Sequence, residues 1–103
     1  MHPPLSIALA QLNPHLGNVR GNLDRLVAAR AKAAENGAVM IVTPEMYLAG
    51  YPCDDLVLRS DFMDEVAAAI DELTALTEDG GPAIIVGAPH AEGGVIHNSV
   101  FVL

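Results

Sequence analysis

The residues best suited to chemistry lie in one short segment, TPEMYLAGYPCDDL, which spans residues 43–56. It contains one glutamate, Glu45, together with two tyrosines, a pair of aspartates and the single cysteine of the chain. The apolar run AVMIV, residues 38–42, comes just before it and has the length of a buried strand. Because ligands gather where the strands of a parallel α/β sheet end, we predict that Glu45 lies at such an edge, where it could act as a general base.

Pro44 supports this placement of Glu45. A proline has no backbone N–H, so it cannot continue a central strand, and the ladder should stop there. The carboxylate would then be held on a stiff turn, where partial burial would suit a general base that works near neutral pH. A structural role is the alternative: Glu45 could cap a neighbouring helix or pair with an arginine. The residues alone leave both interpretations open.

Cys53 is a poor candidate for a nucleophile. It lies beside Asp54 and Asp55, whose negative charge raises the pKa of a thiol, and no basic residue is near it in the sequence. We therefore expect Cys53 to be a small structural or solvent-facing residue. Lys32, the only lysine, falls in the polar part of a predicted helix, which argues against a catalytic role.

The sequence predicts no metal and no cofactor in this segment. Asp54 and Asp55 lack the ligand-rich loop that a hard cation requires. The glycine-containing stretch GAPHAEGG has neither the G-x-G-x-x-G pattern nor the lysine of a phosphate-binding loop. The four histidines have no metal-like spacing; they are His2, His15, His90 and His97.

The hydrophobic pattern predicts an α/β fold with β-α-β-α-β-β order. The first helix should begin at a cap formed by Asn18 or Asn22 and end before Gly37, and the second should be capped by Ser60 or Asp61. The first strand has a length that suits burial on both faces, and the last two strands could pair antiparallel across a glycine turn. The predicted strands span residues 5–12, 38–42, 83–89 and 95–103, and the second helix spans residues 60–79.

Composition and charge exclude several classes of partner. The net charge of −8, from 13 acids and 5 bases, argues against nucleic-acid binding through phosphates. Four of the bases lie between Arg20 and Lys32, where they could form a weak anion-binding face or a solvated helix face. The stretch MHPPLSIALAQL has no basic region ahead of a long apolar core, so we do not expect it to be a signal peptide, and no apolar run approaches the roughly 18–20 residues of a membrane span. One cysteine cannot form an internal disulfide, which favours a cytoplasmic location.

The chain ends at Leu103, within an apolar segment and without a polar tail. An α/β domain rarely ends on its most apolar segment. We therefore expect residues 1–103 to be a truncated piece of a larger domain, with apolar surface left uncovered.

Together these segments resemble the start of a domain of the nitrilase superfamily of carbon–nitrogen hydrolases. The resemblance covers essentially the whole chain, in IALAQLNPHLGNVRGNLDRL, GAVMIVTPEMYLAGYP, AIIVGAPH and HNSVFVL. Within the superfamily, AQLNPHLGNVRGN and PEMYLAGYPCDDLVLR are most similar to the glutaminase domains of glutamine-dependent NAD synthetases. Two positions depart from the pattern: Thr43 stands where an aromatic residue is frequent, and Cys53 where proline is common.

The resemblance implies that residues 1–103 are the N-terminal portion of a glutaminase domain with an α-β-β-α sandwich fold. It also implies a Glu-Lys-Cys triad, of which only the glutamate, as Glu45, maps onto this sequence. Tyr51 matches a loop tyrosine that lines the glutamine pocket, whereas the lysine and the cysteine of the triad lie outside this chain. ATP and Mg²⁺ are implied for a separate synthetase domain that amidates deamido-NAD, and a homo-oligomer is expected for the full-length protein.

Two other functions remain open at this point. The chain could belong to a free-standing amidase or nitrilase of the same superfamily. It could also be a non-catalytic α/β fragment or binding module, since it carries only one member of a three-part catalytic set. In either case we expect residues 1–103 alone to lack amidase activity.

Overall fold

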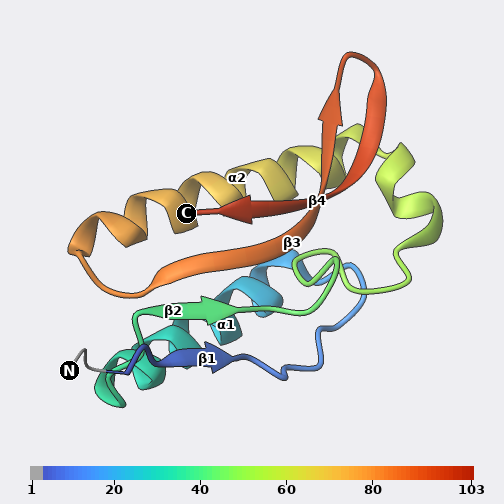
Figure 1. Ribbon diagram of the computed structural model, residues 1–103. Helices are drawn as coiled ribbons and strands as arrows, with labels where there is room; N and C mark the ends of the chain where they lie inside the picture. The colour runs from blue at the N-terminus through green and yellow to red at the C-terminus, as the bar shows by residue number, and fades with distance from the viewer. Residues whose placement is uncertain (1–3) are drawn as a thin grey trace.

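Strands and helices follow one another in the predicted β-α-β-α-β-β order in the computed structural model, which describes residues 4–103 (Figure 1). Two 3-10 helices, η1 (Asp54–Leu58) and η2 (Thr77–Asp79), lie on either side of the second α-helix. The other elements are β1 (Ile7–Leu9), α1 (Val19–Glu35), β2 (Met40–Val42), α2 (Ser60–Leu76), β3 (Ala83–Glu92) and β4 (Val95–Val102). No helix among these residues is both long and apolar enough to span a bilayer.

The strands form one mixed sheet in the order β1-β2-β3-β4. β1, β2 and β3 are parallel, and β4 is antiparallel to β3. The β3–β4 connection is the predicted glycine turn, in which Gly93 and Gly94 have φ angles of 58° and 79°. Left-handed φ values at both turn residues match the twist of a two-residue hairpin. The hairpin continues to Glu92, past the predicted strand end at residue 89, and projects beyond the rest of the chain (Figure 1).

Both α-helices cover the same face of the sheet. β1, β2 and β3 lie side by side in chain order, and the crossovers that join parallel strands share one handedness. The two connecting helices therefore lie on the same side of the sheet. The core between helices and sheet consists mainly of fully buried aliphatic side chains: Leu23 and Leu26 of α1, Val66 and Leu73 of α2, and Ile41, Ile84 and Val86 of the strands.

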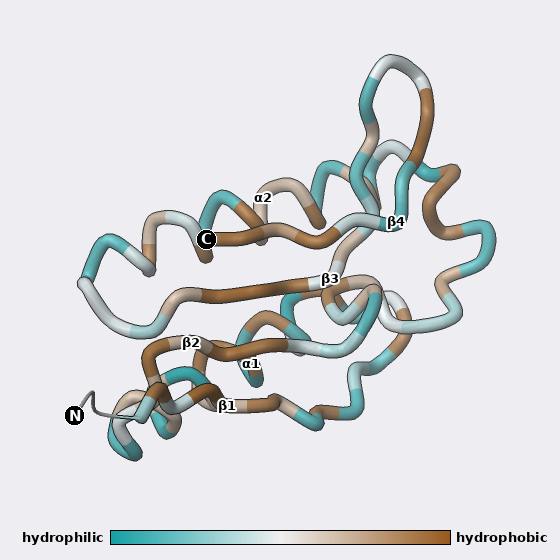
Figure 2. Tube along the Cα trace, in the orientation of Figure 1, coloured by the Kyte–Doolittle hydropathy of each residue, from teal (hydrophilic) through white to brown (hydrophobic). Residues whose placement is uncertain are grey.

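The other face of the sheet, which we call the open face, is apolar and uncovered within residues 4–103. A row of paired residues crosses all four strands on this face: Leu9, Val42, Ile85 and Val102. Leu9 and Val102 are 70% and 74% exposed. Hydrophobic residues follow the strands in Figure 2. The prediction of uncovered apolar surface is therefore confirmed.

The first strand differs from its prediction. It spans three residues instead of 5–12, and it is not buried on both faces, because Ile7 and Leu9 point to the open face. As an edge strand it pairs on one side only, with β2, and α1 covers only its other face. The apolar sequence of a short strand does not show whether one or both of its faces will be covered by other elements of the chain.

The helix ends partly match the predicted caps. Asn18 caps α1, since its side-chain oxygen accepts a hydrogen bond from the Gly21 N–H at 3.0 Å, and Gly37 follows the helix with φ 79°. The predicted caps of α2 are wrong: its N-cap position is Arg59, without a side-chain capping bond. The Asp61 carboxylate instead pairs with the Arg59 guanidinium at 2.9 Å.

Arg30 is part of the fold instead of a solvated or anion-binding helix face. Its side chain is buried on α1, where its guanidinium donates two hydrogen bonds to Asp79, at 3.0 and 2.8 Å, and one to the Pro82 carbonyl at 2.8 Å. These bonds tie α1 to the connection between α2 and β3. Arg20 likewise pairs with Glu72 of α2, at 2.7 Å. Acids of the same chain therefore engage both arginines.

Acid should weaken the Arg30–Asp79 connection over a defined range. The Arg30 guanidinium and the Gly81 N–H lower the pKa of Asp79 to about 2. A carboxylate whose pKa is lowered by folding stabilises the fold fully at pH values above its unfolded-state pKa of about 3.9. This contribution is lost as pH falls through the folded-state pKa of about 2. We expect the difference in thermal midpoint between the wild type and Asp79→Asn to be constant above about pH 5, to shrink below it and to vanish only below about pH 2. A difference that persists unchanged at the lowest pH would contradict this role of Asp79.

Candidate active site

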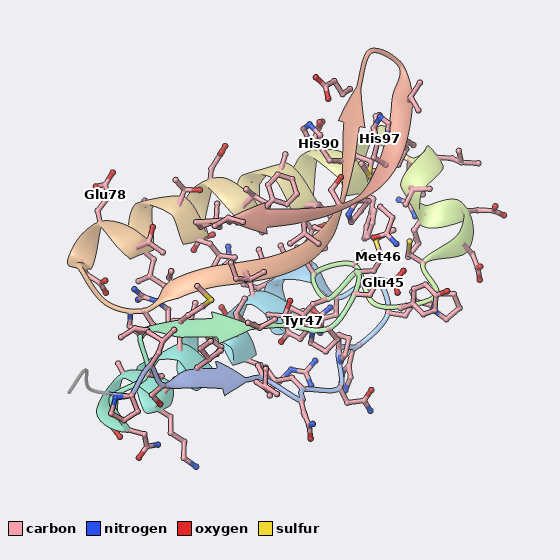
Figure 3. All side chains as sticks on the ribbon, viewed as in Figure 1. Glu45, Met46, Tyr47, Glu78, His90 and His97 are labelled. Atoms are coloured by element: carbon pink, nitrogen blue, oxygen red, sulfur yellow. The ribbon has the colours of Figure 1, made fainter. Side chains whose placement is uncertain are left out.

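Glu45 lies at the carboxyl end of β2, as predicted. The Thr43 N–H donates to the Ile85 carbonyl at 2.9 Å, and Pro44 then ends the pairing with β3. The chain turns at Met46, which has a left-handed φ of 53°. The Gly50 N–H closes this turn with a hydrogen bond of 2.9 Å to the Met46 carbonyl. Figure 3 shows Glu45 and Met46 beside the end of β2.

A glycine on β3 allows the Glu45 turn to pass directly over the open face. Gly87 is buried, and a Cβ built there would lie 2.6 Å from the Met46 nitrogen and 2.8 Å from the Pro44 oxygen. The Gly87 N–H donates to the Thr43 hydroxyl at 3.1 Å, and its carbonyl accepts from the Leu48 N–H at 3.2 Å. The turn therefore rests on β3 backbone at a position where no larger residue fits without a shift.

The Glu45 side chain is exposed and accepts a hydrogen bond from the side-chain amide of Asn98 on β4. Within residues 4–103 this is the one side-chain hydrogen bond to the Glu45 carboxylate, and no ion pair involves it. Glu45 thus neither caps a helix nor pairs with an arginine within residues 4–103. Partial burial is also not observed, because the carboxylate stands at the margin of the open face, which no other element described here covers.

Asn22 anchors the segment that follows Glu45 to α1. It is fully buried, and its amide nitrogen donates to the carbonyls of His15 and Leu48, at 2.9 and 3.0 Å. Its oxygen accepts from the His15 N–H and from the Arg25 guanidinium, at 2.8 and 2.7 Å. The buried Tyr47 hydroxyl donates to the Asn22 carbonyl at 2.6 Å. Asn22 was predicted as a possible cap of α1, but Asn18 is the cap and Asn22 is buried. Its position among the apolar residues of α1 could have indicated this burial.

Removing this anchor should loosen the loop. Asn22→Ala leaves the buried Leu48 carbonyl without a donor, which costs on the order of 1–3 kcal/mol, whereas the His15 carbonyl keeps the Asn18 N–H as a donor. We expect faster amide hydrogen exchange across residues 47–50, measured by mass spectrometry, while β3 retains its protection. Asn18→Ala is a matched control, because Asn18 caps the same helix but its side chain bonds, within residues 4–103, only to the Gly21 N–H. Equal exchange in the two variants would show that Asn22 does not anchor the loop.

The structure does not bring Cys53 and Lys32 together with Glu45 as a catalytic set. Cys53 is buried, and this burial, together with the nearby Asp54 carboxylate, raises the pKa of its thiol. A raised pKa lowers the thiolate fraction at neutral pH, so the expectation of a structural cysteine is supported. Lys32 is exposed on α1, on the side of the sheet away from the open face.

Tyr51 is 67% exposed in the loop between Glu45 and η1, where a small molecule could reach it. The structure does not test its predicted contact with glutamine. Asp54 and Asp55 are exposed, and no group of three or more potential metal-ligating side chains occurs among residues 4–103. This part of the chain thus offers one placed carboxylate, a supporting amide and an accessible tyrosine.

The sequence and fold match known proteins over nearly the whole chain. A family model described as carbon-nitrogen hydrolase matches residues 6–103. The glutamine-dependent NAD(+) synthetase of Rhodobacter capsulatus is 38% identical over 97 residues, which cover 94% of this chain and 17% of that protein. This chain therefore spans about a sixth of the length of that relative.

Solved structures give the same result. Glutamine-dependent NAD+ synthetase from Acinetobacter baumannii, in complex with ADP, superimposes with a TM-score of 0.86 at 30% identity, covering 94% of this chain and 18% of that one. An amidase from Nesterenkonia sp. superimposes with a TM-score of 0.74 at 33% identity, covering 86% and 34%. A glutamate-to-leucine mutant of the amidase from Nesterenkonia sp. AN1 shows covalent addition of the acetamide moiety of fluoroacetamide at its active-site cysteine.

Proposed function

This chain belongs to the carbon-nitrogen hydrolase family, and we propose that it is the N-terminal part of a glutaminase domain in a glutamine-dependent NAD synthetase. The observation that carries the proposal is the placement of Glu45. It lies where β2 ends, on a turn held by Gly87, in a chain most of which aligns with such a synthetase at 38% identity. A free-standing amidase is the alternative: that superposition has a lower TM-score, 0.74 against 0.86, at a similar identity, 33% against 30%.

In the proposed reaction Glu45 is the general base. Its carboxylate accepts the proton of a cysteine thiol, and the thiolate then attacks the side-chain carboxamide of glutamine. A lysine stabilises the tetrahedral intermediate, and Glu45 passes its proton to the amide nitrogen, so that ammonia leaves. Water then hydrolyses the remaining thioester to glutamate. Both the cysteine and the lysine come from outside residues 1–103, since Cys53 is buried and Lys32 is on the far side of the sheet. Tyr51 would line the glutamine pocket.

The open face is where we expect the cysteine and the lysine that residues 1–103 do not supply. Glu45 stands at its margin, and the exposed Leu9 and Val102 lie on it. We propose that a further part of the same polypeptide covers this apolar face. Such a cover would bury Glu45, exclude water and strengthen the electrostatic interactions of the carboxylate. The partial burial expected from the sequence would then arise on assembly of the whole domain.

ATP and Mg²⁺ do not fit this segment. The part of the chain that the structure describes has no cluster that could hold a metal, and the sequence has no phosphate-binding motif. If the protein amidates deamido-NAD, these groups bind in a synthetase domain outside residues 1–103. We further propose a cytoplasmic location and a homo-oligomer for the full-length protein.

One assay separates this function from its alternatives. The protein expressed from its complete reading frame should release ammonia from glutamine and form NAD from deamido-NAD in the presence of ATP and Mg²⁺. Hydrolysis of simple amides or nitriles without NAD formation would identify a free-standing amidase or nitrilase. Absence of any amide hydrolysis would identify a non-catalytic module.

A further inference from the structure

We propose that Asn98 is a positioning residue for Glu45. Its side-chain amide holds one carboxylate oxygen, so that the other oxygen is presented to the proton that Glu45 accepts. This inference rests on the proposed function, because it assigns Asn98 to the same reaction.

The contact joins two residues that are 53 positions apart in the sequence. The Asn98 Nδ2 group donates to Glu45 Oε1. An ionised carboxylate can only accept hydrogen bonds, so the NH₂ end of the amide must face it, and this settles the orientation of the Asn98 side chain. Because no other side chain of residues 4–103 bonds to the carboxylate, this bond alone restrains its rotation.

The sheet register places Asn98 at this point. Asn98 precedes Val100 and Val102 at alternate positions of β4, so all three point to the open face. Val100 is paired with Gly87 of β3, and the missing side chain of Gly87 lets the Glu45 turn cross that face. The backbone of Glu45 is thus held by β3 and its side chain by β4. Two neighbouring strands together define where the carboxylate lies.

An amide is well suited to this task. It donates a hydrogen bond without adding a charge, so it orients the carboxylate without forming an ion pair with it, as a guanidinium or an ammonium would. One bond uses one of about four acceptor sites on the two carboxylate oxygens. Oε2 therefore remains free for a thiol. Correct alignment of a reacting group matters because a displacement of about 1 Å can cost about 10²-fold in rate.

The test uses the protein expressed from its complete reading frame, with Asn98→Ala and Asn98→Asp as variants. We expect Asn98→Ala to lower kcat for glutamine about 10- to 100-fold, with KM changed less than about twofold, because Asn98 holds the base and not the substrate. Asn98→Asp should lower kcat at least as much, since it removes the donor and places a second carboxylate against Glu45.

A neighbouring residue supplies the matched control. Ser99 follows Asn98 on β4 and points to the other face, and within residues 4–103 its hydroxyl bonds only to the His97 carbonyl. Ser99→Ala should therefore retain wild-type kcat and KM.

A double-mutant cycle separates positioning from general damage to the fold. If Asn98 acts through Glu45, Asn98→Ala should change kcat less than about twofold when Glu45→Gln is already present. An equal loss in both backgrounds would overturn the proposal, as would an Asn98→Ala variant with wild-type kcat. In those cases a Glu45→Gln variant that is strongly impaired would leave the proposed function standing. A Glu45→Gln variant with full turnover would overturn both.

Discussion

Glu45→Gln should reduce glutamine hydrolysis by a factor on the order of 10²–10⁴ in the protein expressed from its complete reading frame. Glutamine has nearly the same shape as glutamate and can still accept the bond from Asn98 after rotation of its amide, but it cannot take a proton from a thiol at neutral pH. The loss should therefore appear in kcat more than in KM. Ammonia release under saturating glutamine is the measurement.

Two controls make this result specific to Glu45. Glu65→Gln replaces an exposed glutamate on α2, on the helix-covered side of the sheet, and should leave turnover unchanged. If the protein is a synthetase, added ammonia should restore NAD formation by the Glu45→Gln variant, because Glu45 acts only in the hydrolysis of glutamine. Glutamine turnover that is unaffected by Glu45→Gln would remove this residue from the mechanism.

Residues 1–103 expressed alone should hydrolyse no glutamine. The reason is chemical: the one cysteine is buried, its thiol pKa is raised, and the one lysine lies on α1, away from Glu45. Without a thiolate there is no acyl acceptor, and Glu45 has no proton to remove. Turnover by this chain that is abolished by Cys53→Ser would contradict the interpretation.

The same sample should self-associate, because the open face leaves a continuous apolar surface exposed to water. Leu9→Lys combined with Val102→Lys should reduce association, measured by sedimentation velocity. Leu58→Lys is a matched control, since Leu58 is 75% exposed but lies in η1, away from the sheet. A freely soluble monomer of wild-type sequence would show that the open face does not need a cover.

Features that depend on neighbouring residues could be predicted before the structure was known. The β-α-β-α-β-β order follows from apolar runs and helical periodicity, and the β3–β4 hairpin from Gly93 and Gly94. Glu45 was placed at the end of β2 because Pro44 cannot continue a strand. Gly87 could also have indicated that another backbone packs against β3, since a glycine inside a strand frequently marks such a close approach.

The caps show where such local reasoning failed. Asn18 and Asn22 have the same chemistry and are one helical turn apart, yet one caps α1 and the other is buried against the loop. Arg30 was assigned to a polar helix face, but its side chain is buried and bonds to Asp79, which is 49 residues away. Each outcome depends on a partner that is distant in the sequence and therefore outside any local pattern.

The sequence by itself determined the order of the elements, the turn after β2 and the identity of the candidate base, because each depends on the conformational limits of a few adjacent residues. Only the tertiary structure decided that Asn98 holds Glu45, that Gly87 supports its turn and that one face of the sheet stays open. The physical reason is that strand register and crossover handedness bring together residues that are far apart in the sequence. No local sequence pattern predicts such contacts.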